Sequence, residues 1–151
     1  MLSQEQNDLI TRVGPGTASG SLMRRYWQPV ALVDELSGTS RPIKPVKLLG
    51  ENLVLFRDGK GRYGLVERAC PHRGTDLAYG RLENEGLRCA FHGWLFDVAG
   101  RCLQTPAEPD DSNLCGQIRQ KAYPVIERSG ILFAYLGPGE PPELIVARPE
   151  P

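Results

Sequence analysis

Histidine, net charge and long apolar runs are what this sequence lacks. Its 151 residues include only two histidines, and 18 basic residues balance 18 acidic ones. A balanced charge argues against general binding to nucleic acid or to anionic membranes, because both need an excess of Lys and Arg. The longest apolar run covers residues 131–136, so no membrane span is predicted. Residues 1–13 are polar and lack the apolar core of a secretory signal, so we expect a cytoplasmic protein.

Cysteine is scarce as well, with four residues at Cys70, Cys89, Cys102 and Cys115. An even number could form two disulfides in an exported protein, whereas cysteines of cytoplasmic proteins are more often metal ligands. Cys102 alternates with apolar residues, which is typical of a small buried side chain in a strand. Cys115 falls in a polar segment, where we expect a free thiol. A disulfide between Cys102 and Cys115 is disfavoured in the cytoplasm.

Glycine and proline are abundant, with 17 and 13 residues, and the apolar segments between them are short. This pattern is typical of a turn-rich domain of antiparallel strands. Ser3 followed by Gln6 predicts an N-cap for a short helix over residues 3–13, with a small apolar face around Leu9 and Ile10. We expect a polar loop over residues 105–117, and strands at 27–33, 46–49, 52–57, 63–67, 87–90, 95–98, 101–104, 125–128 and 131–136.

Two short pairs of candidate metal ligands stand out: Cys70 with His72, and Cys89 with His92. Each pair offers one thiolate and one imidazole. A [2Fe–2S] cluster takes four protein ligands, and two histidines in place of two cysteines on one iron define a Rieske centre. Neutral imidazoles remove negative charge from that iron, so it accepts an electron more easily. These residues therefore indicate a Rieske-type [2Fe–2S] cluster and one-electron transfer.

The neighbours of these pairs are candidates for the environment of the cluster. Gly74 and Gly93 follow the two histidines, and glycine lets backbone N–H groups approach the cluster sulfurs and stabilise their negative charge. We expect the Trp94 side chain either to pack over the cluster or, alternatively, to take part in the docking of a partner. Arg73 belongs to a group of arginines that forms either a solvated face with ion pairs or a basic rim that steers an acidic electron donor. The other members are Arg68, Arg81, Arg88 and Arg101.

These motifs resemble the N-terminal Rieske domain of ring-hydroxylating oxygenases. The resemblance is carried by Cys70-Pro-His72-Arg73-Gly74, Tyr79-Gly80-Arg81, Cys89-Ala-Phe-His92-Gly93-Trp94, Phe96-Asp97 and Gly100. The stretch from Arg24 to Val30 is similar to the phthalate-dioxygenase-like branch. The resemblance covers residues 1–140, which we expect to form one Rieske domain. Residues 141–151 look like a Pro- and Glu-rich linker or tail.

The resemblance implies an all-β Rieske iron–sulfur fold of antiparallel sheets, with a small cluster-binding subdomain and a short N-terminal helix. It also implies that Cys70 and Cys89 hold one iron, while His72 and His92 hold the outer iron through their δ nitrogens. In full-length members of the family, a redox partner supplies the electrons, either a flavin/iron–sulfur reductase or a ferredoxin. The cluster passes them to a mononuclear iron in a catalytic domain, usually that of the neighbouring subunit.

A mononuclear iron site needs two histidines and one carboxylate. The cluster would use both histidines of this sequence, so we expect no catalytic residues here. The first hypothesis is therefore the electron-relay domain of an oxygenase whose catalytic domain is missing from this chain, and the alternative is a stand-alone Rieske ferredoxin-type carrier. A third hypothesis is a zinc-stabilised module, although one residue between Cys70 and His72 is a tighter spacing than zinc usually has.

Respiratory-type Rieske proteins resemble this sequence less closely, because they carry an additional cysteine in each loop. They also have a serine after the second His-Gly, whose hydroxyl bonds a cluster sulfide, and here that position is Trp94. Fewer hydrogen bonds to sulfur predict a midpoint potential nearer about −150 than +300 mV. The second N–H of each ligand histidine should become more acidic on a ferric cluster, so the potential should fall at alkaline pH.

Overall fold

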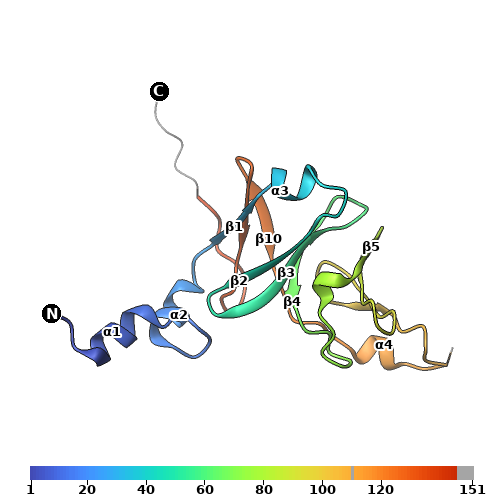
Figure 1. The fold of residues 1–151 in the computed structure, drawn as a ribbon, viewed down its shortest axis with the longest axis horizontal. Helices are drawn as coiled ribbons and strands as arrows, with labels where there is room; N and C mark the ends of the chain where they lie inside the picture. Colours follow the sequence, from blue (N-terminus) through green and yellow to red (C-terminus); the bar gives the residue numbers. More distant parts are fainter. Residues whose placement is uncertain (110, 146–151) are drawn as a thin grey trace.

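The structure is a computed structural model that describes residues 1–109 and 111–145. Within those residues the strands form three antiparallel sheets, of order β1-β11-β10, β2-β3-β4-β9 and β5-β6-β7-β8 (Figure 1). The predicted all-β class is thereby confirmed. The strands are β1 (Gln28–Leu32), β2 (Ile43–Leu48), β3 (Glu51–Arg57), β4 (Tyr63–Glu67), β5 (Arg81–Glu83), β6 (Gly86–Arg88), β7 (Leu95–Phe96), β8 (Cys102–Gln104), β9 (Ala122–Tyr123), β10 (Val125–Arg128) and β11 (Ile131–Ala134).

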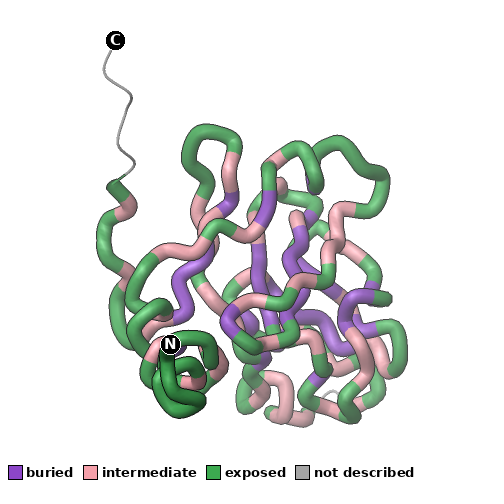
Figure 2. Tube along the Cα trace, turned by 60° about the vertical axis from the view of Figure 1, so that its left-hand side comes forward, coloured by how far each residue is buried: buried purple, intermediate pink, exposed green. Residues whose placement is uncertain are grey.

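The middle sheet is buried on both faces because β3 carries a continuous apolar run over residues 53–56. Successive side chains of a strand point to opposite faces, so one strand can supply two cores. Leu53 and Leu55 pack with the β1-β11-β10 sheet, while Val54 and Phe56 pack with the sheet of β5 to β8. Figure 2 shows these buried segments through the centre of the molecule. We call the first two sheets the β-sandwich, and residues 69–120 the small subdomain.

The predicted N-terminal helix is confirmed as α1 (Gln4–Thr11). The backbone N–H of Gln6 donates to the Ser3 hydroxyl, and the backbone N–H of Ser3 donates to the Gln6 side chain, which completes the expected cap. Leu9 and Ile10 do form an apolar face, but each is 57 % exposed. The helix therefore projects from one side of the molecule without joining either core (Figure 1).

Several short elements were not expected from the sequence pattern. They are α2 (Ala18–Met23), α3 (Asp34–Ser37), the 3₁₀ turn η1 (Leu77–Tyr79), α4 (Leu114–Gln117), and the strands β5 and β9. The prediction of a loop throughout residues 105–117 was wrong at its end, because Cys115 lies in α4. Strand β2 begins before the predicted 46–49 and includes Pro45, which it tolerates as the edge of its sheet. Elements of two to six residues carry too few side chains for a period to show.

The predicted tail is only partly covered by the structure. Trp27 Nε1 donates to the Pro142 carbonyl at 2.7 Å, so the first tail residues lie beside the start of β1. Residues 146–151 of the predicted tail lie outside the described residues. Among the helices that the structure describes, none is long and apolar enough to cross a membrane.

Candidate metal centre

Two loops of the small subdomain carry the four candidate ligands. The first loop, residues 70–75, lies between β4 and η1, and the second, residues 89–94, lies between β6 and β7. In each loop the cysteine N–H donates to the carbonyl five residues later, Thr75 at 2.9 Å and Trp94 at 2.8 Å. In each loop the glycine N–H donates back to the cysteine carbonyl. The two ligand loops are therefore two copies of one tight turn.

Glycine is needed in both turns for its backbone conformation. Gly74 and Gly93 have φ of +72° and +75°, a region that residues with a Cβ rarely adopt. Their own N–H groups are used by the cysteine carbonyls. The groups that face the Cys70 thiol are instead the backbone N–H groups of His72 and Arg73, which partly oppose the rise in its pKa that burial causes. The glycines thus shape the loops, and other amides face the sulfur.

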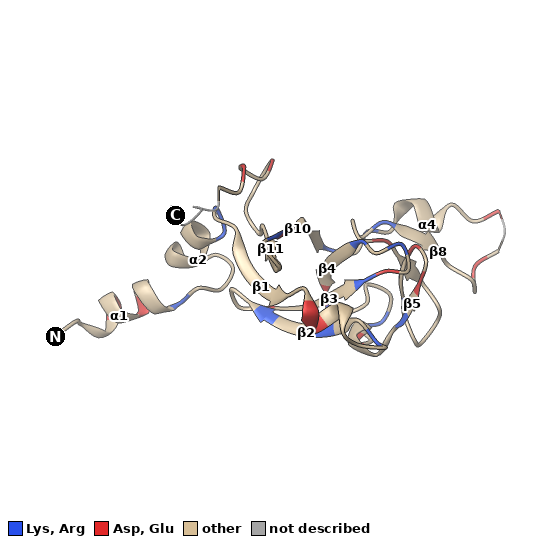
Figure 3. Cartoon of the chain, turned by 90° about the horizontal axis from the view of Figure 1, so that it is seen from above, with Lys and Arg blue, Asp and Glu red and all other residues tan. Residues whose placement is uncertain are grey.

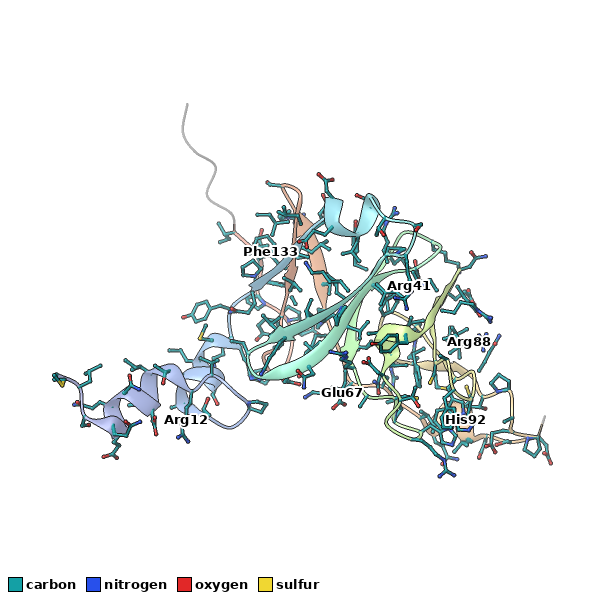
Figure 4. All side chains as sticks on the ribbon, viewed as in Figure 1. Arg12, Arg41, Glu67, Arg88, His92 and Phe133 are labelled. Carbon is teal, nitrogen blue, oxygen red and sulfur yellow. The ribbon has the colours of Figure 1, made fainter. Side chains whose placement is uncertain are left out.

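The two histidine rings converge, with centroids 4.5 Å apart. His72 Nδ1 is buried and has no hydrogen-bond partner, which is unfavourable unless another group binds it. This is the nitrogen through which the resemblance predicts iron binding. Burial, followed by the charges of His92 and Arg73, lowers the pKa of His72, which favours the neutral, metal-binding form of its ring. Figure 4 shows His92 at the opposite end of the molecule from Arg12.

The two cysteines of these loops are deeply buried, at 3 % exposure for Cys70 and 4 % for Cys89, and neither forms a disulfide. Burial raises the pKa of the Cys70 thiol to about 11, and the neighbouring Cys89 adds to the rise. A thiolate in this place therefore needs a cation beside it. A ferric ion held by both sulfurs would supply that charge, so the residues fit an iron–sulfur cluster.

The arrangement of the four candidate ligands can be compared with that of a structural zinc site. Among residues 1–109 and 111–145, no three His, Cys, Asp or Glu side chains converge on a point suited to one metal ion. A structural zinc site gathers four ligands around a single ion. Each iron of a [2Fe–2S] cluster takes only two protein ligands. The close histidine rings and the neighbouring cysteines fit that arrangement of two ligands for each iron.

Aromatic side chains flank the histidine pair on two sides. Trp94 is buried, and its ring stacks on His72 with centroids 4.4 Å apart and planes 6° apart. Phe91 is 62 % exposed, and its ring centroid lies 3.9 Å from that of His92. Of the two predictions for Trp94, packing beside the site is the one that this geometry favours. Phe91 marks the place where the histidine pair meets the surface.

Four of the five arginines near the site form ion pairs, as one of the two predictions proposed, while Arg73 is exposed and forms no ion pair with a described residue. Figure 3 shows basic and acidic residues interspersed along the backbone at this end of the molecule. Asp76 also accepts the Ala78 N–H at the start of η1, so it stabilises a turn as its position in the sequence suggests. The pairs are Arg68 with Asp76 at 2.6 Å, Arg81 with Glu83 at 2.8 Å, Arg88 with Glu83 at 2.6 Å, and Arg101 with Asp97 at 2.6 Å.

Arg88 has a more specific role than membership of a charged face. Its Nη1 donates to the carbonyl of Gly93 in the second ligand loop, and Glu83 holds the rest of the guanidinium group. Two hydrogen bonds from Arg88, together with those from the nearby Arg81, lower the pKa of Glu83 to about 2. Sequence reasoning missed this link because Glu83 belongs to no recognisable motif.

Gln120 is a second supporting residue that sequence reasoning missed. It is 3 % exposed, and its side-chain Nε2 donates to the carbonyls of Glu67 and Ala69 at 2.6 and 2.9 Å. It therefore fixes the backbone that leads into the first ligand loop. A single glutamine in a polar stretch gives no signal of such a role.

The comparisons with known proteins agree with this geometry. The model of the Rieske [2Fe-2S] domain family matches residues 26–124. The chain is 50 % identical over 148 residues to the oxygenase subunit of 5,5'-dehydrodivanillate O-demethylase from Sphingobium sp., covering 95 % of this chain and 34 % of that protein. It is 44 % identical over 138 residues to the oxygenase subunit of phthalate 4,5-dioxygenase from Pseudomonas putida, covering 91 % and 31 %. The chain thus spans about a third of the length of these curated relatives.

Solved structures agree as well. The oxygenase–ferredoxin complex of carbazole 1,9a-dioxygenase matches with a TM-score of 0.68 and 32 % identity, over 80 % of this chain and 30 % of that chain. NdmA of Pseudomonas putida CBB5 matches with a TM-score of 0.67 and 32 % identity, over 76 % and 35 %. This chain therefore belongs to the Rieske [2Fe-2S] domain family, with a Rieske-type [2Fe–2S] cluster, and it matches the N-terminal Rieske domains of ring-hydroxylating oxygenase subunits.

Proposed function

We propose that this chain is the electron-transfer domain of a ring-hydroxylating oxygenase subunit. In this proposal Cys70 and Cys89 hold one iron of the cluster, and His72 and His92 hold the outer iron through their δ nitrogens. The observation that supports it most directly is the buried, unbonded Nδ1 of His72 beside the ring of His92. When bound, the cluster takes up and releases one electron at a time.

The residues of this chain would orient the ligands and control the access of water. The hydrogen bonds of the two ligand loops hold each cysteine at the start of its turn. Trp94 covers one face of the His72 ring, while Arg88 ties the second ligand loop to β5 and β6. Both histidines are half-buried and both cysteines are buried, so the histidine side of the cluster lies nearest the surface. We infer that electrons enter and leave there.

The partners follow from the same proposal. The curated relatives named above are oxygenase subunits, and one of the solved relatives is an oxygenase bound to a ferredoxin. A ferredoxin or a flavin/iron–sulfur reductase would supply electrons to this cluster in the cytoplasm. A catalytic domain with its own mononuclear iron would receive them, since both histidines of this sequence serve the cluster. A stand-alone carrier of the ferredoxin type is the second candidate, and a gene without a downstream catalytic domain would favour it.

Optical and EPR spectra of the purified protein test the cluster and its ligands. We expect a red-brown protein whose dithionite-reduced form gives the low average g value of a cluster with two histidine ligands. Cys89→Ser should abolish that signal, whereas Cys115→Ser, a cysteine outside the proposed ligand set, should preserve it. A colourless, EPR-silent protein with one bound zinc would refute the proposal.

The midpoint potential is a second expected outcome. Trp94 offers no hydroxyl group to the cluster and is stacked on His72 instead. We therefore expect a potential near the low end of the Rieske range, about −150 mV at neutral pH, with a decrease at alkaline pH. Protein-film voltammetry between pH 6 and 11 measures both. A potential well above zero, or one independent of pH, would contradict this prediction.

A further inference from the structure

Outside the proposed ligand set, the structure brings the remaining two cysteines together. The Cys115 Sγ lies 3.4 Å from the Cys102 Sγ, with Cys102 in β8 and Cys115 in α4. Neither is in a disulfide. We propose that Cys102 and Cys115 form a dithiol site that a hydroperoxide oxidises to a reversible disulfide.

The fold itself holds the two thiols in place. A β-bridge pairs Arg101 with Arg119, so the residue before Cys102 and the segment after Cys115 lie side by side. The backbone N–H of Gln120 also donates to the Gly100 carbonyl at 2.8 Å. Backbone pairing next to the two cysteines therefore brings their segments together.

The two sulfurs need to move only a short distance to form the disulfide, and the movement falls on the short helix α4. A disulfide needs the sulfurs to approach to about 2.05 Å. Helix α4 has only four residues, and its N-cap, Asn113, makes no side-chain capping bond. A Cβ added at Gly116 would meet nothing within 4 Å, so the helix has open space next to Cys115.

The exposure of the two cysteines sets the order of the steps. Cys115 is half-buried and reachable from solvent, whereas Cys102 is 9 % exposed. The Cys115 thiolate attacks the hydroperoxide: an S–O bond forms, the O–O bond breaks, and with hydrogen peroxide the leaving hydroxide takes a proton and departs as water. The Cys102 sulfur then attacks the Cys115 sulfur, the S–O bond breaks, and the hydroxide takes the Cys102 proton. The thiols lose two electrons, the peroxide gains two, and two waters are released.

Oxidation at this place would act on the surroundings of the cluster. Residues 103–109 begin the segment between the two cysteines, and Pro106 lies against Gly93, where an added Cβ would be 3.4 Å from its ring. The disulfide would tether this segment beside the second ligand loop.

Peptide mapping of the holoprotein tests the proposal directly. Trypsin cleaves after Arg101 and Arg119, so residues 102–119 form one peptide that contains both cysteines. The protein is treated with hydrogen peroxide, alkylated and digested, while the visible absorbance of the cluster is followed in the same sample. We expect this peptide to become two hydrogens lighter and to lose both alkyl labels, and dithiothreitol to restore them.

Two serine variants distinguish disulfide formation between Cys102 and Cys115 from oxidative damage to the cluster. Cys115→Ser and Cys102→Ser should each prevent the lighter peptide while leaving the absorbance of the cluster unchanged. The proposal is overturned if both cysteines stay alkylatable, if Cys115 proceeds to a sulfinic acid, or if Cys102 links to Cys70 or Cys89. It is also overturned if the bond between Cys102 and Cys115 forms only as fast as the cluster bleaches. None of these outcomes bears on whether the protein carries the cluster.

Discussion

The β-sandwich and the small subdomain are both made of antiparallel hairpins, but different interactions stabilise them. The sandwich has strands of up to seven residues and a core of buried aliphatic side chains such as Leu55 and Leu132. The strands of the small subdomain have two or three residues each, and its core includes Cys70 and Cys89, the proposed ligands. Burial of apolar side chains alone can stabilise the sandwich, whereas the stability of the small subdomain depends partly on a bound cofactor.

The same turn, built around an aspartate, occurs in both regions. Asp58 follows β3 of the sandwich and Asp97 follows β7 of the small subdomain. Each is buried, and each carboxylate accepts the backbone N–H groups two and four residues later, together with the side chain of the arginine four residues later. Since the turns match, the difference between the regions lies in strand length and core composition, and not in local hairpin chemistry.

Removal of the cluster should give the largest effect. Cys89→Ser should abolish the visible absorbance and also loosen the small subdomain, because an unpaired ligand set leaves buried polar groups in its core. Amide hydrogen exchange should become fast over residues 70–104 and stay slow over β3, β4 and β11. Uniform loss of protection in both regions, or in neither, would show that the cluster does not stabilise one region selectively. Cys115→Ser serves as the matched control.

A matched pair of core substitutions should give the next largest effect. Leu87 and Leu132 are both 0 % exposed, but Leu87 packs in the core of the small subdomain and Leu132 in the sandwich. Leu→Ala should cost about 2–5 kcal/mol at either site, through lost burial and the cavity left behind. We expect Leu132→Ala to lower the free energy of unfolding with normal cluster content, and Leu87→Ala to speed the loss of the cluster. Chemical denaturation and absorbance decay measure the two effects, and equal rates of cluster loss would contradict this assignment.

Acidification should give the smallest effect, through Glu83. Its pKa is lowered to about 2 by hydrogen bonds from Arg88 and Arg81. A carboxyl whose pKa is lower in the folded state contributes stability above its unfolded pKa of about 4.3, and that contribution is lost as the pH falls towards 2. The wild type should therefore retain its cluster longer than Glu83→Gln at pH 6, and this advantage should shrink between pH 4.3 and 2. An advantage that does not change with pH would show that the ion pair is not its source.

The sequence was most informative where chemistry is tied to residue type and short spacing. The two Cys/His pairs predicted the cofactor, and the family comparison supports it. The capped helix over residues 3–13 and the longer strands were also predicted, since Ser3 with Gln6 and the apolar run at 53–56 are local signals. The supporting contacts of Glu83 and Gln120 were not predictable, because Glu83 belongs to no recognisable motif and Gln120 bonds a residue 53 positions away in the sequence.

By itself, the sequence determined which atoms are offered to the metal and that the chain is made of short antiparallel strands. Only the tertiary structure decided that Gly74 and Gly93 shape two copies of one turn, that His72 Nδ1 is left without a partner, and that Cys102 meets Cys115. The reason is physical: ligand chemistry belongs to individual side chains, whereas the conformation of a turn depends on the whole loop and the contact between the two cysteines depends on backbone pairing between separate segments. The bridge from Arg101 to Arg119 illustrates this, since nothing in either residue's neighbourhood indicates that the two segments meet.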